Sequence, residues 1–92
     1  MPIDSVAVLM ADCYFLEGEI YVKQWSYDMK DYTLVKYDSL FEHHGVTKEL
    51  LMQNVKYYLT ANQKLASILM ERVDEIVEQR VAALRDSLNK EP

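Results

Sequence analysis

Asp12 is the side chain of this 92-residue chain with the strongest case for a chemical role, because it is the one charged residue in the apolar stretch VAVLMADCYFL, residues 6–16. An unpaired charge in apolar surroundings is costly, so the carboxylate needs a partner. Three arrangements are open: a structural hydrogen bond to a tyrosine hydroxyl or a helix end, a functional pairing with Glu19 or a residue of the last helix, and exposure in a gap between helices. We favour the structural hydrogen bond, and we group Asp12 with Tyr57 and Tyr58 as a candidate buried polar site.

His43 and His44 are the residues to consider for metal binding. Adjacent positions on a helix point about 100° apart, whereas two histidines that share a metal typically stand four residues apart. Glu42 does not complete a ligand set, because no further histidine or cysteine stands at ligand spacing. Imidazoles in the last turn of a helix interact favourably with the helix dipole, and we favour this role over metal binding. The sequence predicts no metal site.

Catalytic signatures are missing from the sequence. Cys13 is the single cysteine, so no intramolecular disulfide can form, and we expect its thiol to behave as a small core hydrophobe. No serine stands in a nucleophile elbow, no glycine-rich phosphate loop is present, and no pair of histidines has metallohydrolase spacing. We therefore expect no catalytic residues and no cofactor, and we expect that the protein is not an enzyme.

The charge pattern argues against nucleic acid and against membrane insertion. The chain has 10 basic and 15 acidic residues, a net charge of -5, and no basic patch of the kind that binds phosphate backbones. Residues 6–16 are too short to span a bilayer, which takes about 20 apolar residues. Asp4 stands where a signal peptide carries positive charge. We expect a soluble chain with no targeting segment and no nucleic-acid partner.

Hydrophobic periodicity predicts a single all-α domain, residues 1–92, with four helices and a long last helix. Their approximate bounds are 3–25, 30–44, 48–59 and 62–89. No segment alternates apolar and polar residues between turn signals, and no internal repeat is present. Because residues 6–16 are apolar on every helical face, they should be buried on nearly every side.

Glycine and capping residues mark the boundary between the second and third helices. Gly45 can adopt the left-handed conformation that closes a helix at low steric cost. Thr47 is a natural N-cap, with Val46 and Leu51 at the two positions of a hydrophobic staple. We expect the second helix to end before Gly45.

Two further positions leave a question for the structure. The fourth helix begins either with a capping box from Thr60 and Gln63 or with Asn62 as a direct cap. Gly18 is the one poor helix former in the first helix, and we expect it to mark the close approach of another helix.

The predicted last helix is longer than the domain is wide. At about 1.5 Å per residue, residues 63–89 span about 40 Å, while a compact globule of this size is about 32 Å across. The last turns should therefore overhang. Val77, Val81, Leu84 and Leu88 form an apolar stripe with coiled-coil spacing there, and either the first helix or another chain must cover it.

Aromatic residues gather around the predicted connection between the first and second helices. They are Tyr14, Tyr21, Trp25, Tyr27, Tyr32 and Tyr37. Such rings either seal the rim of a small core or form a binding surface, and we favour packing. Tyr57 and Tyr58 point in different directions from the third helix, so one should pack and the other should lie near the surface.

Two stretches carry a family resemblance: VAVLMADCYFLEGEI in the first helix and YDSLFEHHGVTKELLMQNVKYYLTANQKLASIL from the second helix onward. Over roughly residues 2–77 the chain resembles the small bacterial envelope proteins grouped as domain of unknown function 4296. The most distinctive pieces are Asp12 with Glu17, Tyr37 with Phe41 before HHGVT, and Tyr57 with Tyr58. None of these pieces is a catalytic signature.

The resemblance implies a lipoprotein, in which a signal peptide, a lipidated cysteine and a short spacer precede the helical domain. Cys13 cannot be the lipid site, because it lies inside the first helix. The resemblance then implies that Met1 begins a shortened form of the native protein. The location implied is the cell envelope, with the domain facing the periplasm and held at the membrane only by a lipid anchor that this chain lacks.

Two functions fit these features. The first is a non-catalytic adaptor that binds a protein partner, or a second copy of itself, through the tyrosine-rich edge or the overhanging stripe. The alternative is a small-ligand binder with a tyrosine-lined pocket between the first, second and last helices, floored by Asp12.

Overall fold

The computed structural model describes residues 1–23 and 29–89. Within these ranges the chain forms four α-helices and no strand, which confirms the predicted all-α class. The helices are α1 (Ile3–Lys23), α2 (Met29–His44), α3 (Lys48–Thr60) and α4 (Gln63–Asn89). The predicted extension of the first helix to residue 25 lies outside the described residues, and so do Trp25 and Tyr27 of the expected aromatic cluster.

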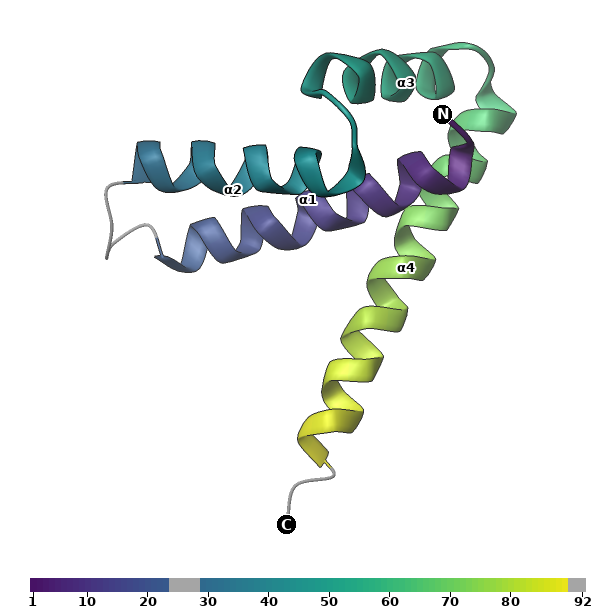
Figure 1. The fold of residues 1–92 in the computed structure, drawn as a ribbon. Helices are drawn as coiled ribbons and strands as arrows, with labels where there is room; N and C mark the ends of the chain where they lie inside the picture. Colours follow the sequence, from purple (N-terminus) through teal and green to yellow (C-terminus); the bar gives the residue numbers. More distant parts are fainter. Residues whose placement is uncertain (24–28, 90–92) are drawn as a thin grey trace.

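The other three helices pack against α1. Its most extensive contact is with α4, it also contacts α2 and α3, and α3 packs on α4. Figure 1 shows α2 running alongside α1, α3 lying near the N-terminal end of α1, and α4 leaving that end at a steep angle. The helix that carries the apolar stretch is therefore the centre of the domain.

The core lies where α1, α3 and α4 meet. Leu9, Leu69 and Val6 are its largest fully buried side chains. The whole buried cluster consists of Val6, Ala7, Leu9, Leu51, Leu69 and Val73. Burying one large side chain of this type stabilises the fold by roughly 1.5–3 kcal/mol. No described side chain of α2 is buried, so α2 adds little to this core.

The second half of the apolar stretch is less covered than its composition predicts. Tyr14 is 61% exposed, and Phe15 is only partly buried. The expectation of burial on nearly every side is therefore wrong at this end of residues 6–16. The physical reason is geometric: α4 diverges from α1 towards the C-terminal end of α1 (Figure 1), and of α4 only Arg80 is recorded over the Phe15 ring among the described residues.

The junction between α2 and α3 follows the predicted signals. Gly45 has a φ of 66°, the left-handed conformation that glycine adopts at low cost. The Val46 amide donates to the Phe41 carbonyl at 3.0 Å, and the Gly45 amide donates to the Glu42 carbonyl at the same distance. This pair of bonds is a Schellman motif, which satisfies carbonyls left open at the end of α2. The Thr47 side chain then accepts a hydrogen bond from the first turn of α3, as predicted.

The structure answers both questions that the sequence left open. Asn62 caps α4, because its Oδ1 accepts a hydrogen bond from the Leu65 amide at 2.8 Å. The Thr60 hydroxyl instead donates back to the Lys56 carbonyl at 2.6 Å, so it does not form the capping box. Gly18 has no atom of another helix within 4 Å of the place where a Cβ would stand. The expected close helix approach is wrong, since this part of α1 faces solvent.

The second half of α4 extends away from the rest of the domain. The molecule measures 46 × 34 × 22 Å, and Figure 1 shows no helix beside the C-terminal turns of α4. All side chains of residues 78–89 are exposed. The overhang that the length of this helix predicts is therefore present, and α1 does not cover it.

Candidate functional site

Asp12 lies where α1, α2 and α4 come together. Its Oδ2 is 2.7 Å from Nε2 of His44, in the last turn of α2. Its Oδ1 accepts a hydrogen bond from Arg80 of α4 at 2.5 Å. The Asp12 side chain is 19% exposed, so the carboxylate is largely shielded from water. One carboxylate thus ties α1 to two other helices.

Of the partners considered for Asp12, the structure places one beside it, a residue of the last helix. Arg80 is that residue. Glu19 is not the partner, because its carboxylate contacts Tyr32 and Lys23 instead. We favoured a structural hydrogen bond to a tyrosine hydroxyl or a helix end. No tyrosine hydroxyl bonds Asp12 in the described part of the chain, whereas His44 belongs to the C-terminal end of α2.

Tyr57 and Tyr58 lie away from Asp12. The Tyr58 hydroxyl donates to the Met1 carbonyl at 2.6 Å, and Tyr57 is 58% exposed. The structure therefore does not bring the predicted polar site together, because α3 lies at the N-terminal end of α1. One of the two rings packs and the other lies at the surface, as their adjacent positions predict.

His44 lies in the last turn of α2, as predicted. Its ring packs edge-on against the ring of His43, with 5.3 Å between the two ring centres. Its pairing with Asp12 joins residues 32 positions apart, which helix spacing cannot indicate. No group of three side chains able to hold a metal ion occurs among the residues that the structure describes.

The Asp12 cluster has the composition of a structural ion pair. Each carboxylate oxygen already has a partner, and the Arg80 guanidinium also lies 5.6 Å from the centre of the Phe15 ring. Burial, followed by the charges of Asp12 and Glu17, raises the pKa of the neighbouring Cys13 thiol. A thiol with a raised pKa is a weaker nucleophile at neutral pH. The arrangement is suited to holding helices together.

A second group of polar contacts joins α1 to α2. Tyr37 donates a hydrogen bond to Glu17, and Tyr32 donates one to Glu19 at 2.7 Å. Burial raises the pKa of Tyr37, and its bond to Glu17 raises it further. The bond from Tyr32, followed by that from Lys23, lowers the pKa of Glu19. Tyr32 and Tyr37 are partly buried at the rim of the domain, as we expected. Tyr14 and Tyr21 of the same predicted cluster are 61% and 72% exposed, so the expectation of packing is wrong for these two rings.

The expected pocket, lined by tyrosines and floored by Asp12, is divided between two hollows. One, of about 890 Å³, lies between α1, α2 and α3 and includes Cys13, Tyr37 and Met52. The hollow that includes Asp12 is smaller, about 660 Å³, and lies between α1, α2 and α4. Its described lining contains no tyrosine, because Tyr37 faces the other side of α1.

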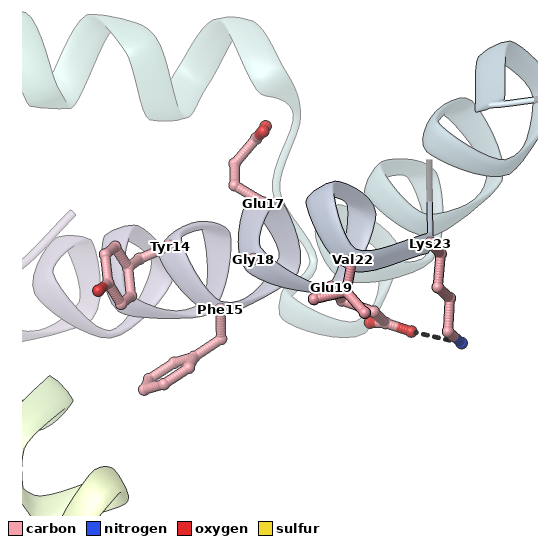
Figure 2. A pocket seen from close by; sticks show the side chains of 7 residues that line it. All are labelled: Tyr14, Phe15, Glu17, Gly18, Glu19, Val22 and Lys23. Carbon is pink, nitrogen blue, oxygen red and sulfur yellow. Dashed lines mark hydrogen bonds and ion pairs between the residues drawn. The ribbon is translucent and has the colours of Figure 1, made fainter. Parts of the chain in front are cut away.

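A third hollow is a surface groove on one helix. Every described residue that lines it belongs to α1. Figure 2 shows Phe15 and Glu17 projecting from opposite sides of this helix, with Lys23 reaching back to Glu19. Of the two rings that line the groove, Tyr14 is exposed and Phe15 is partly buried.

The candidate interaction stripe changes from covered to open along α4. Val77 packs partly against the core. Beyond it, Val81 is 41% exposed, Leu84 is 63% exposed and Leu88 is 64% exposed. We expected either the first helix or another chain to cover this stripe. Within the described part of the chain, Val77 is the only one of the four residues that the core partly covers.

Residues 1–82 match the family described as domain of unknown function (DUF4296). The chain belongs to the DUF4296 family. No curated protein and no solved structure matches it. The family match ends inside α4, so Leu84 and Leu88 lie beyond it. No helix in the described part of this DUF4296 domain is long and apolar enough to cross a membrane.

Sequence reasoning missed Arg80, the second partner of Asp12 in this DUF4296 domain. A signal was present in the sequence. Arg80 follows Val73 by seven residues and Ile76 by four, so it continues the face of α4 that packs on the core. A basic residue on that face is the natural counterpart of an acid in the apolar stretch of α1.

Proposed function

We propose that this domain is a non-catalytic protein-interaction module, and that its binding surface is the stripe of Val77, Val81, Leu84 and Leu88. The observation that carries the proposal is the exposure of the last three of these residues on a helix that has left the core. Contiguous apolar surface of this kind typically marks a site of protein contact. On an amphipathic helix, the apolar side chains form a line along one face, against which a partner helix can pack.

The absence of a catalytic role is part of the proposal. It is supported by the Asp12 cluster, in which both carboxylate oxygens have partners. It is also supported by the raised pKa of Cys13. Within the described residues, no hydroxyl or thiol is hydrogen-bonded to either histidine, so no nucleophile stands beside a base.

A photo-crosslinking amino acid placed in α4 tests the proposal in cells of the native host. At Leu84 it should form an adduct with a bound protein. Asp86 provides the matched control, because two residues along a helix is a rotation of about 200° and its side chain leaves the other face. An adduct at position 84 and none at position 86 is the expected result. No adduct at Leu84, or equal adducts at both positions, overturns the proposal.

We further propose that the native protein is an envelope lipoprotein whose helical domain faces the periplasm. The support for this location is the resemblance described above. Detergent phase separation of the native protein provides the test. A lipidated protein partitions into the detergent phase and carries an acyl mass on a cysteine upstream of the domain. Recovery in the aqueous phase without that mass overturns this location.

The hollow between α1, α2 and α3 supports a second candidate function, the binding of a small ligand. Its volume of about 890 Å³ lies in the range of small-molecule sites, which is about 300–1,000 Å³. Apolar side chains such as Met52 and Phe41 stand there beside the Thr47 hydroxyl. A thermal-shift screen with lipid fragments and small metabolites should then raise the Tm of the domain. The absence of any shift would remove this candidate.

A further inference from the structure

We propose that the partner of the α4 stripe is a second copy of this chain, bound to it in antiparallel orientation over residues 77–88. This inference rests on the proposed function, because it needs the stripe to be a protein-binding surface. It goes further in naming the partner and the direction in which the two helices run. The spacing of the stripe and the charges that flank it support both the partner and the direction.

The spacing of the stripe is that of a short coiled coil. Successive members stand four, three and four residues apart, which is the alternation of heptad positions d and a. Val77 and Leu84 take position d, and Val81 and Leu88 take position a. Asp74, one heptad before Val81, is exposed and charged, so it ends the stripe where α4 enters the core.

The charges beside the stripe are asymmetric. Glu78 and Arg85 occupy the two e positions, directly after the d residues, and neither makes an ion pair within the described part of the chain. Arg80 and Ser87 occupy the g positions. Arg80 pairs with Asp12 of its own chain at 2.5 Å, and its side chain is still 40% exposed, so it can also face charges on a second chain. The free charges that flank the stripe are therefore one acid and one base, both at position e.

A parallel pair of α4 helices would place like charges together. In that orientation a g residue faces the e residue of the partner's next heptad, so each Arg80 would meet the partner's Arg85. Two such contacts form in a symmetric pair. They oppose association, since like charges at these positions are destabilising.

An antiparallel pair places opposite charges together. With Val77 opposite the partner's Leu88 and Val81 opposite the partner's Leu84, the e positions of the two helices face each other. Glu78 then meets the partner's Arg85, and symmetry repeats this contact. Four apolar layers flanked by two attractive pairs result, and in the two outer layers Leu88 meets the part of Val77 that its own core leaves uncovered. The charge pattern thus favours a second copy in this one direction.

The overall shape of the molecule allows this arrangement. The paired segment is about 17 Å long at about 1.5 Å per residue. Because the helices run in opposite directions, the two cores lie at opposite ends of the pair. Each Leu88 meets the partner's Val77 at the point where α4 leaves the core. A contact of this length falls below the roughly 1,200 Å² of a standard interface, so it forms a reversible dimer that depends on concentration.

Charge reversal followed by sedimentation equilibrium at low ionic strength tests the proposal on the whole chain. Glu78→Arg and Arg85→Glu should each weaken dimerisation about tenfold, because two attractive pairs become two repulsive pairs. The double reversal restores the attraction and should restore the affinity. An equimolar mixture of the two single variants should also associate, since each variant then complements the other. Asp86→Arg, which makes the same charge change as Glu78→Arg off the stripe, should leave the affinity unchanged.

Each other outcome has a defined meaning. A chain that stays monomeric at the highest concentration measured overturns the second copy as partner. In that case an adduct at Leu84 with a different protein would still uphold the proposed function. Tighter association of Arg85→Glu overturns the antiparallel direction, because the introduced carboxylate would then attract Arg80 of the other copy in a parallel pair. Circular dichroism of every variant shows whether it keeps the helical fold, so that loss of folding is not read as loss of pairing.

Discussion

The two sides of α1 are held by different kinds of contact. On the side of α4, apolar side chains such as Leu9 and Leu69 are fully buried. On the side of α2, no described side chain of α2 is buried, and Tyr32, Tyr37 and His44 reach carboxylates of α1 instead. The two sides of α1 therefore contribute differently to the stability of the fold and to the position of α2. Burial on one side supplies most of the free energy, while the polar contacts on the other side set where α2 lies along α1.

The apolar residues of α2 show why it needs those polar contacts. Phe41 packs partly against the core, but Leu34 and Val35 are 55% and 62% exposed, so much of the apolar surface of α2 stays in contact with water. Net hydrogen bonds contribute only about 0.5–1.5 kcal/mol each. We therefore expect α2 to be the first part of the domain to loosen when the fold is weakened.

The largest effect should come from the core on the α4 side. Leu69→Ala should lower the free energy of unfolding by about 2–5 kcal/mol, because it leaves a cavity among fully buried side chains. Leu84→Ala is the matched control in the same helix, and it should change stability by less than about 0.5 kcal/mol. Urea denaturation at low protein concentration measures both values. Similar losses for the two variants would contradict the contrast between the two halves of α4.

A smaller loss of stability is expected at Asp12, which contacts both α2 and α4. Asp12→Asn keeps the shape of the side chain but replaces one acceptor oxygen with a donor that faces Arg80 or His44. The free energy of unfolding should fall by about 1.5–3 kcal/mol, the range for hydrogen bonds to charged groups. Asp74→Asn, at an exposed position of α4, is the control and should have little effect. If both variants are as stable as the original chain, the contacts of Asp12 do not help to hold α1 against α2 and α4.

The polar contacts to α2 should each contribute less. Tyr37→Phe removes the hydrogen bond to Glu17 and keeps the ring, so it should cost about 0.5–1.5 kcal/mol. Tyr57→Phe makes the same change on an exposed ring and should leave stability unchanged. Amide hydrogen exchange should also show faster opening of α2 than of α4 in the Tyr37 variant. Equal acceleration in the two helices would argue against separate roles for the two sides.

The smallest effect concerns pH. The hydrogen bond from Tyr32 lowers the pKa of Glu19 below its ordinary value of 4.5. Its contribution to stability is therefore fully present above pH 4.5 and is lost as the pH falls through the lower pKa of the folded state. Glu19→Gln should flatten the dependence of the unfolding midpoint on pH in this acid range. An unchanged slope would show that Glu19 does not contribute.

Several features of the fold could be predicted from the sequence because they depend on neighbouring residues. Gly45 and Thr47 set the junction between α2 and α3 through bonds that reach no further than five residues. The overhang of α4 follows from its length. The failure at Gly18 has a different cause, since whether another helix approaches that glycine depends on the direction in which the helices cross.

The candidate site was predictable only in part. Asp12 stood out because it interrupts an apolar stretch, and that alone indicates that it must find a partner. Its partners are 32 and 68 positions away along the chain.

By itself, the sequence determined the all-α class, the capping of α3 and the apolar stripe on α4, because periodicity and capping act within a few turns of one helix. Only the tertiary structure decided that His44 and Arg80 meet at Asp12 and that Tyr58 binds Met1 instead. Only the tertiary structure also decided that α4 diverges from α1 and leaves Leu84 and Leu88 open. The physical reason is that the angle between packed helices depends on how their side chains interlock across the contact, which no single segment encodes.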